Sequence, residues 1–427
     1  MQVFKYILII IGIVLVFSGC ASKKMIRTDS DICKLKSMND TEKKCTTSSI
    51  EHYDKKDMDF TLSYVEYDDQ GLLYSREQLD KTLGHIKNIK TKQDIVVFIH
   101  GWRHNAKTDD ENVVDIRGYL KAISSLANSK KNGRKISGVY VGWRGVNIDI
   151  FGEHPFLLDA FTFYNRKDVS IEIGNGQIIE LLLELEKMKN ENPNSRLFII
   201  GHSFGGSIVL TALKNIFANR ALTSKSGAYK GFGNSVILIN PAIEGTSYFE
   251  LREISEYLNA NPENIQKDKR PNLITVTSNG DMATKLAFPI ARFLPISLLE
   301  THSTINRKNQ GYYHNQYSEF DMDLYTVGHF EKFTTHYLDA DRGSMKNDNC
   351  EPSKSKNWRT QMYKQFNDNN KSYNFQSSKL GLTYLNNSNI YDPYWVIETN
   401  DDVIKGHNGI FSQNFGCFIS ELYYQEE

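Results

Sequence analysis

The stretch RLFIIGHSFGGSIVL, Arg196 to Leu210, decides the fold that we expect for this chain. An apolar run typical of a buried strand ends at a Gly-His-Ser-Phe-Gly turn, and a second apolar run with helical character follows at once. A turn this tight requires Gly201 and Gly205, because larger side chains there would collide with their neighbours. The sequence therefore predicts that Ser203 is exposed at the end of a strand, where a base can reach its hydroxyl and a helix N-terminus stabilises negative charge.

A second junction between a strand and a loop, FIHGWRHNA from Phe98 to Ala106, is expected to supply hydrogen-bond donors near the serine. A serine that attacks a carbonyl group needs hydrogen-bond donors for the negative charge that develops on the carbonyl oxygen. A His-Gly pair at the end of a buried strand lets the next backbone amide, on Trp102, point toward the serine beside the amide of Phe204. We expect these two amides to form an oxyanion hole.

The chain between residues 58 and 281 alternates strand-like and helical patterns. Segments such as FTLSYVEYD, ISGVYVGWRG, SVILINPA and NLITVTSNGD are separated by segments with helical spacing, such as ENVVDIRGYLKAISSLANS and IIELLLELEKMKN. Strands that alternate with helices predict βαβ units. We therefore expect an α/β fold with a mostly parallel central sheet that helices cover on both faces.

This alternation breaks at Met282. Residues from about 284 to 390 show no clean period and end in a stretch rich in Asn, Ser and Lys, which indicates an insertion. Scattered Tyr, Phe and Leu side chains in its first part favour a cap over the serine that selects the substrate and excludes water. YDPYWVIETN then restores a strand and FGCFISELYYQ a closing helix, so the expected catalytic domain spans 58–427.

The first twenty residues do not belong to this domain. One early cation, Lys5, precedes an apolar run from Tyr6 to Phe17 and two small residues before Cys20, a pattern typical of a secretory signal. A membrane-spanning anchor is the alternative, because the run could nearly cross a bilayer. The end of this segment resembles the lipobox of bacterial lipoproteins, although Phe17 stands where that pattern usually has Leu. The resemblance implies a signal peptide over 1–19 and a diacylglycerol on Cys20.

By the same resemblance, Ala21 after the cysteine implies an outer-membrane destination. Residues 20–57 are polar and poor in periodicity, so we expect a tether between the membrane and the domain. If Cys20 carries lipid, an even number of cysteines remains in an oxidising compartment, and Cys33 with Cys45 is the expected local disulfide. The other two cysteines are Cys350 and Cys417.

The composition narrows the classes of function. The chain has 427 residues, 40% of them hydrophobic, which is enough for a sizeable core. Lys plus Arg and Asp plus Glu both number 51, and the sequence has no basic run or aromatic-basic module, so we expect no nucleic-acid partner. Because the sequence has no CxxC pair or His/Cys cluster with zinc spacing, we also expect no metal site.

The motifs HGW and GHSFGG, an Asp after the next-but-one strand and a late Gly-His together resemble the α/β-hydrolase fold family of serine hydrolases. The resemblance covers about Phe60 to Leu422, and further stretches resemble a bacterial branch of predicted esterases. It implies that the residues around the two turns support the geometry of the loops. These residues are His100, Gly101, Gly201, His202 and Gly205.

The chain order of this family, nucleophile then acid then histidine, guides the choice of the other two catalytic residues. Asp281 is the first carboxylate after the strand NLITVTSNG, while Asp321 and Asp323 are held in reserve because EFDMDLYTV could instead be the relevant strand. His407 follows the last strand-like run and precedes the last helix, as the base does in this family. His329, in VGHF, is the alternative base.

The expected chemistry is hydrolysis of a carboxylic ester, with a small-molecule ester or a lipid as substrate, by Ser203, His407 and Asp281 through an acyl-enzyme. No cofactor is required. The sequence leaves open cleavage of a thioester or an amide, and it does not determine the oligomeric state. Two other functions also stay open: an inactive surface lipoprotein that uses the fold as a binding scaffold, and an acyltransferase with the same triad.

Overall fold

The computed structural model describes residues 24–38, 44–55, 58–129, 133–145, 156–224, 229–261, 263, 270–308, 314–340, 357–368, 371–386 and 388–424. The predicted signal peptide over 1–19 and the predicted lipidation site Cys20 lie outside these residues. No helix in the described part of the chain is long and apolar enough to cross a membrane.

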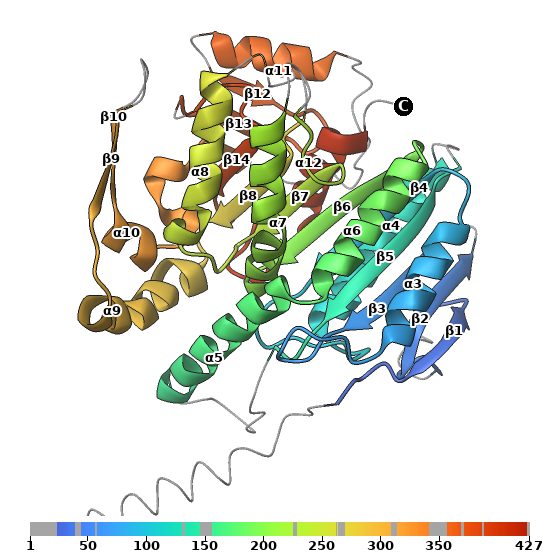
Figure 1. Ribbon diagram of the computed structural model, residues 1–427. Helices are drawn as coiled ribbons and strands as arrows, with labels where there is room; N and C mark the ends of the chain where they lie inside the picture. Colours follow the sequence, from blue (N-terminus) through green and yellow to red (C-terminus); the bar gives the residue numbers. More distant parts are fainter. Residues whose placement is uncertain are drawn as a thin grey trace, which may run out of the picture.

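A twelve-stranded sheet runs through the whole molecule (Figure 1). Its strands, in spatial order, are β1 (Asp29–Leu35), β2 (Ser48–Lys55), β3 (Met58–Glu66), β5 (Lys135–Gly142), β4 (Gln93–Ile99), β6 (Ser195–His202), β7 (Ser235–Ile239), β8 (Leu273–Ser278), β14 (Tyr394–Thr399), β11 (His336–Ala340), β13 (Leu380–Tyr384) and β12 (Ser372–Asn374). All neighbours from β3 to β11 in this order are parallel. The expected mostly parallel α/β sheet is therefore confirmed.

Helices cover both faces of the sheet and enclose two hydrophobic cores. The helices of one face are α3 (Arg76–Asn88), α5 (Phe156–Asn175), α6 (Ile178–Glu191), α7 (Phe204–Thr223) and α8 (Gly245–Ala260). Those of the other face are α4 (Glu111–Ser129), α11 (Trp358–Asn367) and α12 (Gln413–Tyr424). Because both faces are covered, every residue of the central strands β4 and β6 is buried, and such strands read as continuous apolar runs.

The predicted tether over 20–57 is wrong where β1 and β2 extend the sheet beyond β3. The polar side chains that are buried in this segment form ion pairs, both within the segment and with α4. The fully buried carboxylate of Glu51 accepts hydrogen bonds from Arg27 Nη1 at 3.2 Å and from Arg117 Nη2 at 2.8 Å. A buried charge is tolerated when it is paired in this way, so a polar sequence can still supply strands.

The predicted disulfide between Cys33 and Cys45 is confirmed. It joins β1 to the segment that leads into β2. Cys417, in α12, is disulfide-bonded as well. The sheet edge formed by β1 and β2, for which the sequence showed no strand pattern, is thus stabilised by the disulfide Cys33–Cys45 and by the buried ion pairs of Glu51.

The predicted insertion over 284–390 is wrong in its second half. Its first half does leave the sheet, as η3 (Ala283–Ala287), α9 (Phe288–Leu299), the hairpin of β9 (Thr304–Lys308) and β10 (His314–Ser318), and α10 (Glu319–Leu324). The chain then returns, because β11 pairs with β14 and β13, and β12 pairs with β13. These strands have only three to five residues, too few to give a clear period of two in the sequence.

Helix α11 belongs to the core and not to a cap, and this assignment predicts a difference between two substitutions. Trp358→Ala removes a side chain that is 2% exposed and should lower the free energy of unfolding by about 3–5 kcal/mol. Lys364→Ala, on the exposed face of the same helix, should change it by no more than about 0.5 kcal/mol. Urea denaturation measures both, and equal effects of the two substitutions would contradict the assignment.

Candidate active site

Ser203 lies at the turn between β6 and α7 in a backbone conformation that serine rarely adopts, with φ 55° and ψ −120°. Such strain costs on the order of 1–3 kcal/mol and persists only where the surroundings enforce it. Here the amide of Ser203 donates to Ile239 O at 3.1 Å, and its carbonyl accepts from the amide of Ala242 at 3.2 Å. Neighbouring strand and loop backbone therefore hold the serine in the strained turn that the sequence predicts.

Three glycines allow the backbone to close around this turn. A Cβ on Gly205 would lie 2.0 Å from Ile99 O, and one on Gly201 would lie 2.6 Å from Gly205 O. A Cβ on Gly101 would lie 2.7 Å from the Cβ of Ser203. The loop after β4 therefore lies in direct contact with the serine, at a distance that no residue with a side chain permits.

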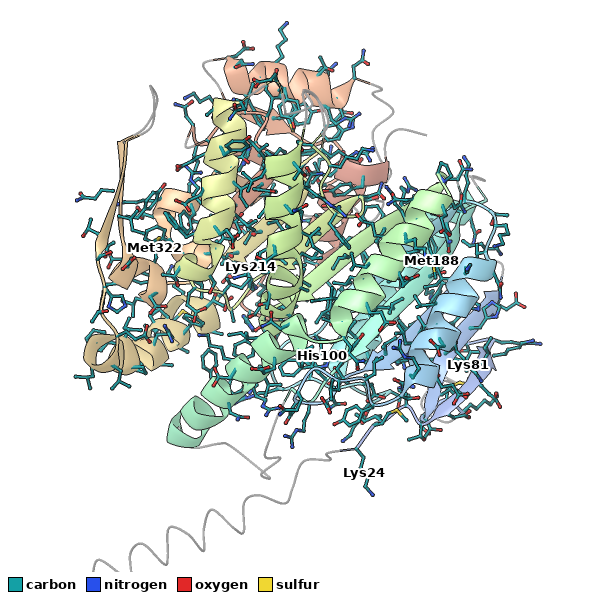
Figure 2. The ribbon with its side chains drawn as sticks, viewed as in Figure 1. Lys24, Lys81, His100, Met188, Lys214 and Met322 are labelled. Atoms are coloured by element: carbon teal, nitrogen blue, oxygen red, sulfur yellow. A yellow bond between two sulfur atoms is a disulfide. The ribbon has the colours of Figure 1, made fainter. Side chains whose placement is uncertain are left out.

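His100 fixes the orientation of this loop, and Figure 2 shows it at the edge of the sheet where β4 ends. The backbone amide of Trp143 donates to its Nε2 at 3.1 Å, so Nδ1 carries the proton and donates to Gly101 O at 2.9 Å. Burial lowers the pKa of His100 to about 4, which keeps the ring neutral. Because the C=O and N–H of a trans peptide point in opposite directions, the amide of Trp102 points away from His100.

The two amides expected to form the oxyanion hole belong to residues that share one aromatic neighbour. Phe204 is the first residue of α7, where a backbone amide has no acceptor within the helix. The ring of Phe163, from α5, lies 5.0 Å from the ring of Phe204 and 5.8 Å from that of Trp102. The side chains of the two predicted residues thus pack against the same ring of α5.

Asp281 follows β8 and is completely buried. Its Oδ1 accepts hydrogen bonds from the amides of Ala283 at 3.0 Å and Thr284 at 3.2 Å. Its Oδ2 accepts from Thr284 Oγ1 at 2.5 Å and from His407 Nδ1 at 2.9 Å. Burial raises the pKa of this carboxyl, but the hydrogen bonds from His407 and Thr284 outweigh burial, and the net pKa lies below its ordinary value.

The loop that carries His407 is held from two strands. Asn240, directly after β7, donates through Nδ2 to Gly406 O at 3.0 Å and to His407 O at 2.9 Å. His202 Nε2 also donates to His407 O at 3.0 Å, and the two imidazole rings lie 4.8 Å apart. Burial lowers the pKa of His202 well below its usual range. The predicted base therefore lies beside the residue that precedes Ser203.

The structure brings the three predicted catalytic residues to one edge of the sheet but joins only two of them directly. Asp281 and His407 share a hydrogen bond, whereas in the described residues none links Ser203 Oγ to His407. Catalytic hydrogen bonds of this kind often tighten only in the complex with substrate.

The reserve candidates lie elsewhere. Asp321 and Asp323 belong to α10, not to a strand, and Asp323 accepts from Arg292 Nη2 at 2.6 Å. His329 Nε2 lies 3.1 Å from Thr284 Oγ1 and reaches Asp281 only through that hydroxyl, whereas His407 bonds to Asp281 directly. Neither reserve carboxylate is therefore placed to orient His407.

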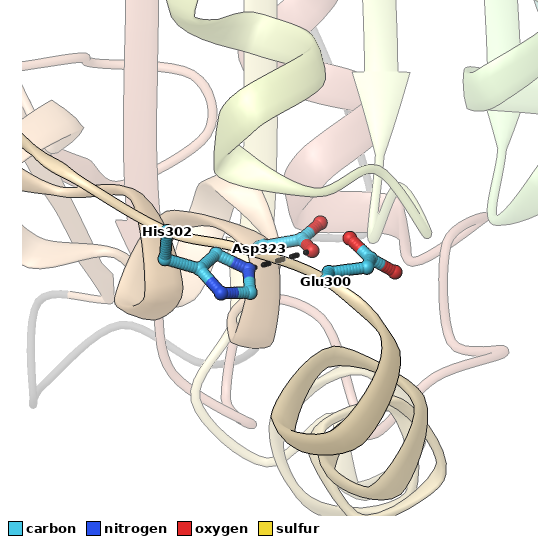
Figure 3. Close-up of side chains that lie close together, drawn as sticks. All are labelled: Glu300, His302 and Asp323. Atoms are coloured by element: carbon cyan, nitrogen blue, oxygen red, sulfur yellow. Dashed lines mark ion pairs between the residues drawn. The ribbon is translucent and has the colours of Figure 1, made fainter.

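Glu300, His302 and Asp323 are the described side chains that could together hold a metal ion, with ligand atoms within 4.8 Å of one another (Figure 3). His302 Nε2 lies 3.5 Å from Asp323 Oδ2. The guanidinium of Arg292, from α9, already contacts both carboxylates, at 2.6 Å from Asp323 and 3.7 Å from Glu300. Arg292 therefore supplies a cation to this cluster, which links α9 to α10.

Two positioning residues of the site were missed in the sequence. Asn240 occurs in LINPA, and Thr284 three residues after Asp281. A polar side chain directly after a buried strand, followed by proline, is a signal that could have identified Asn240. For Thr284 the local sequence offers only a turn pattern, which does not reveal its contact with His329.

Comparison of the chain with protein-family models found no match, and comparison with curated proteins found none either. The chemistry of this site therefore has to be inferred from its own geometry.

The role of Asn240 can be tested apart from any activity. Asn240→Ala removes a buried amide that donates twice to the His407 loop, and should speed hydrogen exchange of the amides of residues 406–409 by about tenfold or more. Asn190→Ala, at an exposed position of α6, is the control and should leave their exchange unchanged. Mass spectrometry measures the exchange, and unchanged rates in the Asn240 variant would show that other contacts hold the loop.

Proposed function

We propose that the chain is a serine hydrolase of the α/β-hydrolase fold that cleaves carboxylic esters. The observation that carries the proposal is the hydrogen bond of 2.9 Å between Asp281 Oδ2 and His407 Nδ1, in a loop that also contacts the residue preceding Ser203. A binding scaffold has no need for a buried carboxylate paired with a histidine beside a serine held at positive φ.

The pairing with Asp281 determines what His407 can do. An ionised carboxylate only accepts hydrogen bonds, so Nδ1 of the neutral ring carries the proton and Nε2 keeps its lone pair. The depressed pKa of Asp281 keeps it ionised at neutral pH. His407 Nε2 is therefore the base, and Asp281 stabilises the imidazolium that forms when His407 takes a proton.

In the first half of the reaction, Ser203 Oγ attacks the carbonyl carbon while its proton moves to His407 Nε2. The carbonyl oxygen becomes an oxyanion, which the amides of Trp102 and Phe204 bind; each such donor supplies about 2.7–4 kcal/mol of transition-state stabilisation. The tetrahedral intermediate then collapses, the bond to the leaving oxygen breaks, and His407 gives its proton to the departing alcohol.

The second half removes the acyl group from the serine. A water molecule attacks the acyl-enzyme while His407 takes one of its protons, and the second intermediate collapses with return of that proton to Ser203 Oγ. The products are a carboxylic acid and an alcohol. All proton transfers run through His407, and the protein groups need no cofactor for them.

The surface next to Asp281 favours an apolar acyl group or a lipid as substrate. Met282, Leu286, Ile290 and Phe293 are 58%, 50%, 48% and 51% exposed. Their spacing of four, four and three residues places them on one face of η3 and α9, which begin directly after the catalytic acid. Apolar side chains gathered in this way mark a surface that contacts an apolar partner. The expected lipoprotein anchor and outer-membrane location are consistent with such a substrate.

The acyltransferase and the inactive scaffold remain as alternatives from the sequence. A transferase would use the same serine and differ only in the acceptor, so an added alcohol would give a new ester as product. An inactive scaffold would leave Ser203 unreactive. The first experiment below separates the scaffold from the other two functions.

A fluorophosphonate probe should label the protein at Ser203, because the probe reacts only with a serine whose hydroxyl is activated by a base. Ser203→Ala should abolish labelling. Ser207→Ala is the matched control one helical turn further on, where the hydroxyl is bonded to Ser170, and should label as the wild type does. Labelling that persists in Ser203→Ala, or no labelling of the folded wild type, would contradict the proposal.

The assignment of the acid gives a second test with p-nitrophenyl esters of graded chain length. Asp281→Asn should lower kcat/KM by roughly 10³- to 10⁴-fold, since an amide cannot stabilise the imidazolium and favours the wrong tautomer. Asp323→Asn, the reserve acid, should stay within about tenfold of the wild type, or about 1.4 kcal/mol in barrier. A large effect of Asp323→Asn together with a small effect of Asp281→Asn would show that Asp323, in α10, is the catalytic acid.

A further inference from the structure

Asp281 is linked to two histidines, of which the proposed triad uses one. His407 donates to its Oδ2 directly, at 2.9 Å. His329 reaches the same oxygen through Thr284, whose Oγ1 lies 2.5 Å from Oδ2 and 3.1 Å from His329 Nε2. The four side chains form a continuous row of hydrogen bonds that ends at the base.

The chemistry of the hydroxyl fixes the direction of these bonds. Thr284 has one hydroxyl proton, and because the ionised carboxylate can only accept, that proton points to Asp281. Thr284 Oγ1 must therefore accept from His329, so His329 carries its proton on Nε2. Burial lowers the pKa of His329 to about 4 in spite of the nearby Asp281, and the ring is a neutral donor at physiological pH.

The segment that carries His329 is pressed against the sheet. A Cβ on Gly328 would lie 1.8 Å from Thr277 Oγ1, in β8, so the short helix η4 (Val327–His329) makes a close approach that only glycine allows. The amide of Val327 also donates to Ile243 O at 2.8 Å. The segment that carries His329 is thus fixed against β8, the strand that leads to Asp281. A residue that orients Thr284 needs such a fixed position.

We propose that His329 is a positioning residue that acts through Thr284: it holds the threonine hydroxyl as a donor to Asp281 and thereby sets how strongly Asp281 holds His407. Hydrogen bonds in a row polarise one another. The bond that His329 donates to Thr284 Oγ1 strengthens the bond that Thr284 donates to Asp281 Oδ2. Without His329 that second bond is weaker, and more of the charge on Oδ2 acts on His407 Nδ1. The role in turnover rests on the proposed function, whereas the order of the hydrogen bonds does not.

Other titratable or charged groups lie near this row of hydrogen bonds, and the variants proposed below leave them unchanged. Lys285, on η3, acts on His329. His202, on β6, lies beside His407, and Asp401 accepts from the amide of Gly406 at 3.0 Å in the loop after β14. None of them is changed by substitutions at His329 or Thr284.

The test compares three variants with the wild-type protein. His329→Phe keeps the ring shape but has no donor, His329→Gln keeps a donor in reach of Thr284, and Thr284→Val removes the hydroxyl. His336→Phe is the matched control, the same change at another buried histidine, in β11, whose ring packs against Trp395. Two quantities are measured: the rate of fluorophosphonate labelling as a function of pH, and the NMR signal of the His407 Nδ1 proton.

We expect His329→Phe to slow labelling about threefold at pH values below the midpoint of the rate profile, because a smaller fraction of His407 is then the free base. The acidic midpoint of its rate profile should move to higher pH by about half a unit, because Asp281 then stabilises the imidazolium more strongly. The His407 Nδ1 proton should move downfield for the same reason. Thr284→Val should change both quantities in the same direction and further, and His329→Gln should restore both toward the wild type.

A profile and proton signal in His329→Phe equal to those of the wild type and of His336→Phe would overturn the proposal. So would a His329→Gln variant that behaves as His329→Phe does, since the ring and not its donor would then matter. The NMR signal reports on the bond between His407 and Asp281 without turnover. If the wild type is not labelled at all, the proposed function fails while the proton signal still decides the role of His329.

Discussion

The close approach of three stretches of backbone around Ser203 is the constraint on which the rest of the site depends. The loop after β4, the end of β6 and the start of α7 approach so closely that a Cβ on Gly205 would lie 2.0 Å from Ile99 O. This contact places the loop that carries Trp102 against Ser203, and hydrogen bonds to Ile239 and Ala242 hold the unusual φ of the serine. The parallel sheet supplies the geometry, because strand ends that meet at one edge allow loops from distant parts of the chain to touch.

The features that the sequence could predict are those whose cause is local. Ser203 and its glycines stand within six residues, and the continuous apolar runs of β4 and β6 follow from burial on both faces. Asp281 lies three residues after the end of β8 and His407 eight residues after the end of β14, so the loops that follow these strands identify both residues even though their contact is long-range. The order of the elements thus carried most of the information about the site.

What could not be predicted depends on partners far away in the chain. β2 looked too polar for a strand, since its buried Glu51 is tolerated only because Arg27 and Arg117 reach it from other segments. Among the short strands, β11 pairs with β14 and β13 pairs with β11, and both bury side chains in the core that includes α11, without a pattern of their own. Sequence periodicity indicates which face of a single helix or strand is buried. A buried polar network, or a short strand at the end of a sheet, depends instead on contacts with distant parts of the chain.

The separation of the acid and the base has a consequence for how the protein is made. Asp281 and His407 are 126 residues apart, and β8, which leads to Asp281, pairs directly with β14, which leads to His407. Parallel pairing across such a long loop is among the slow steps of folding. During synthesis Ser203 and Asp281 therefore exist long before His407 can join them. In the proposed hydrolase, a partly made or partly folded chain lacks the base, so Ser203 becomes reactive only when β14 has paired with β8.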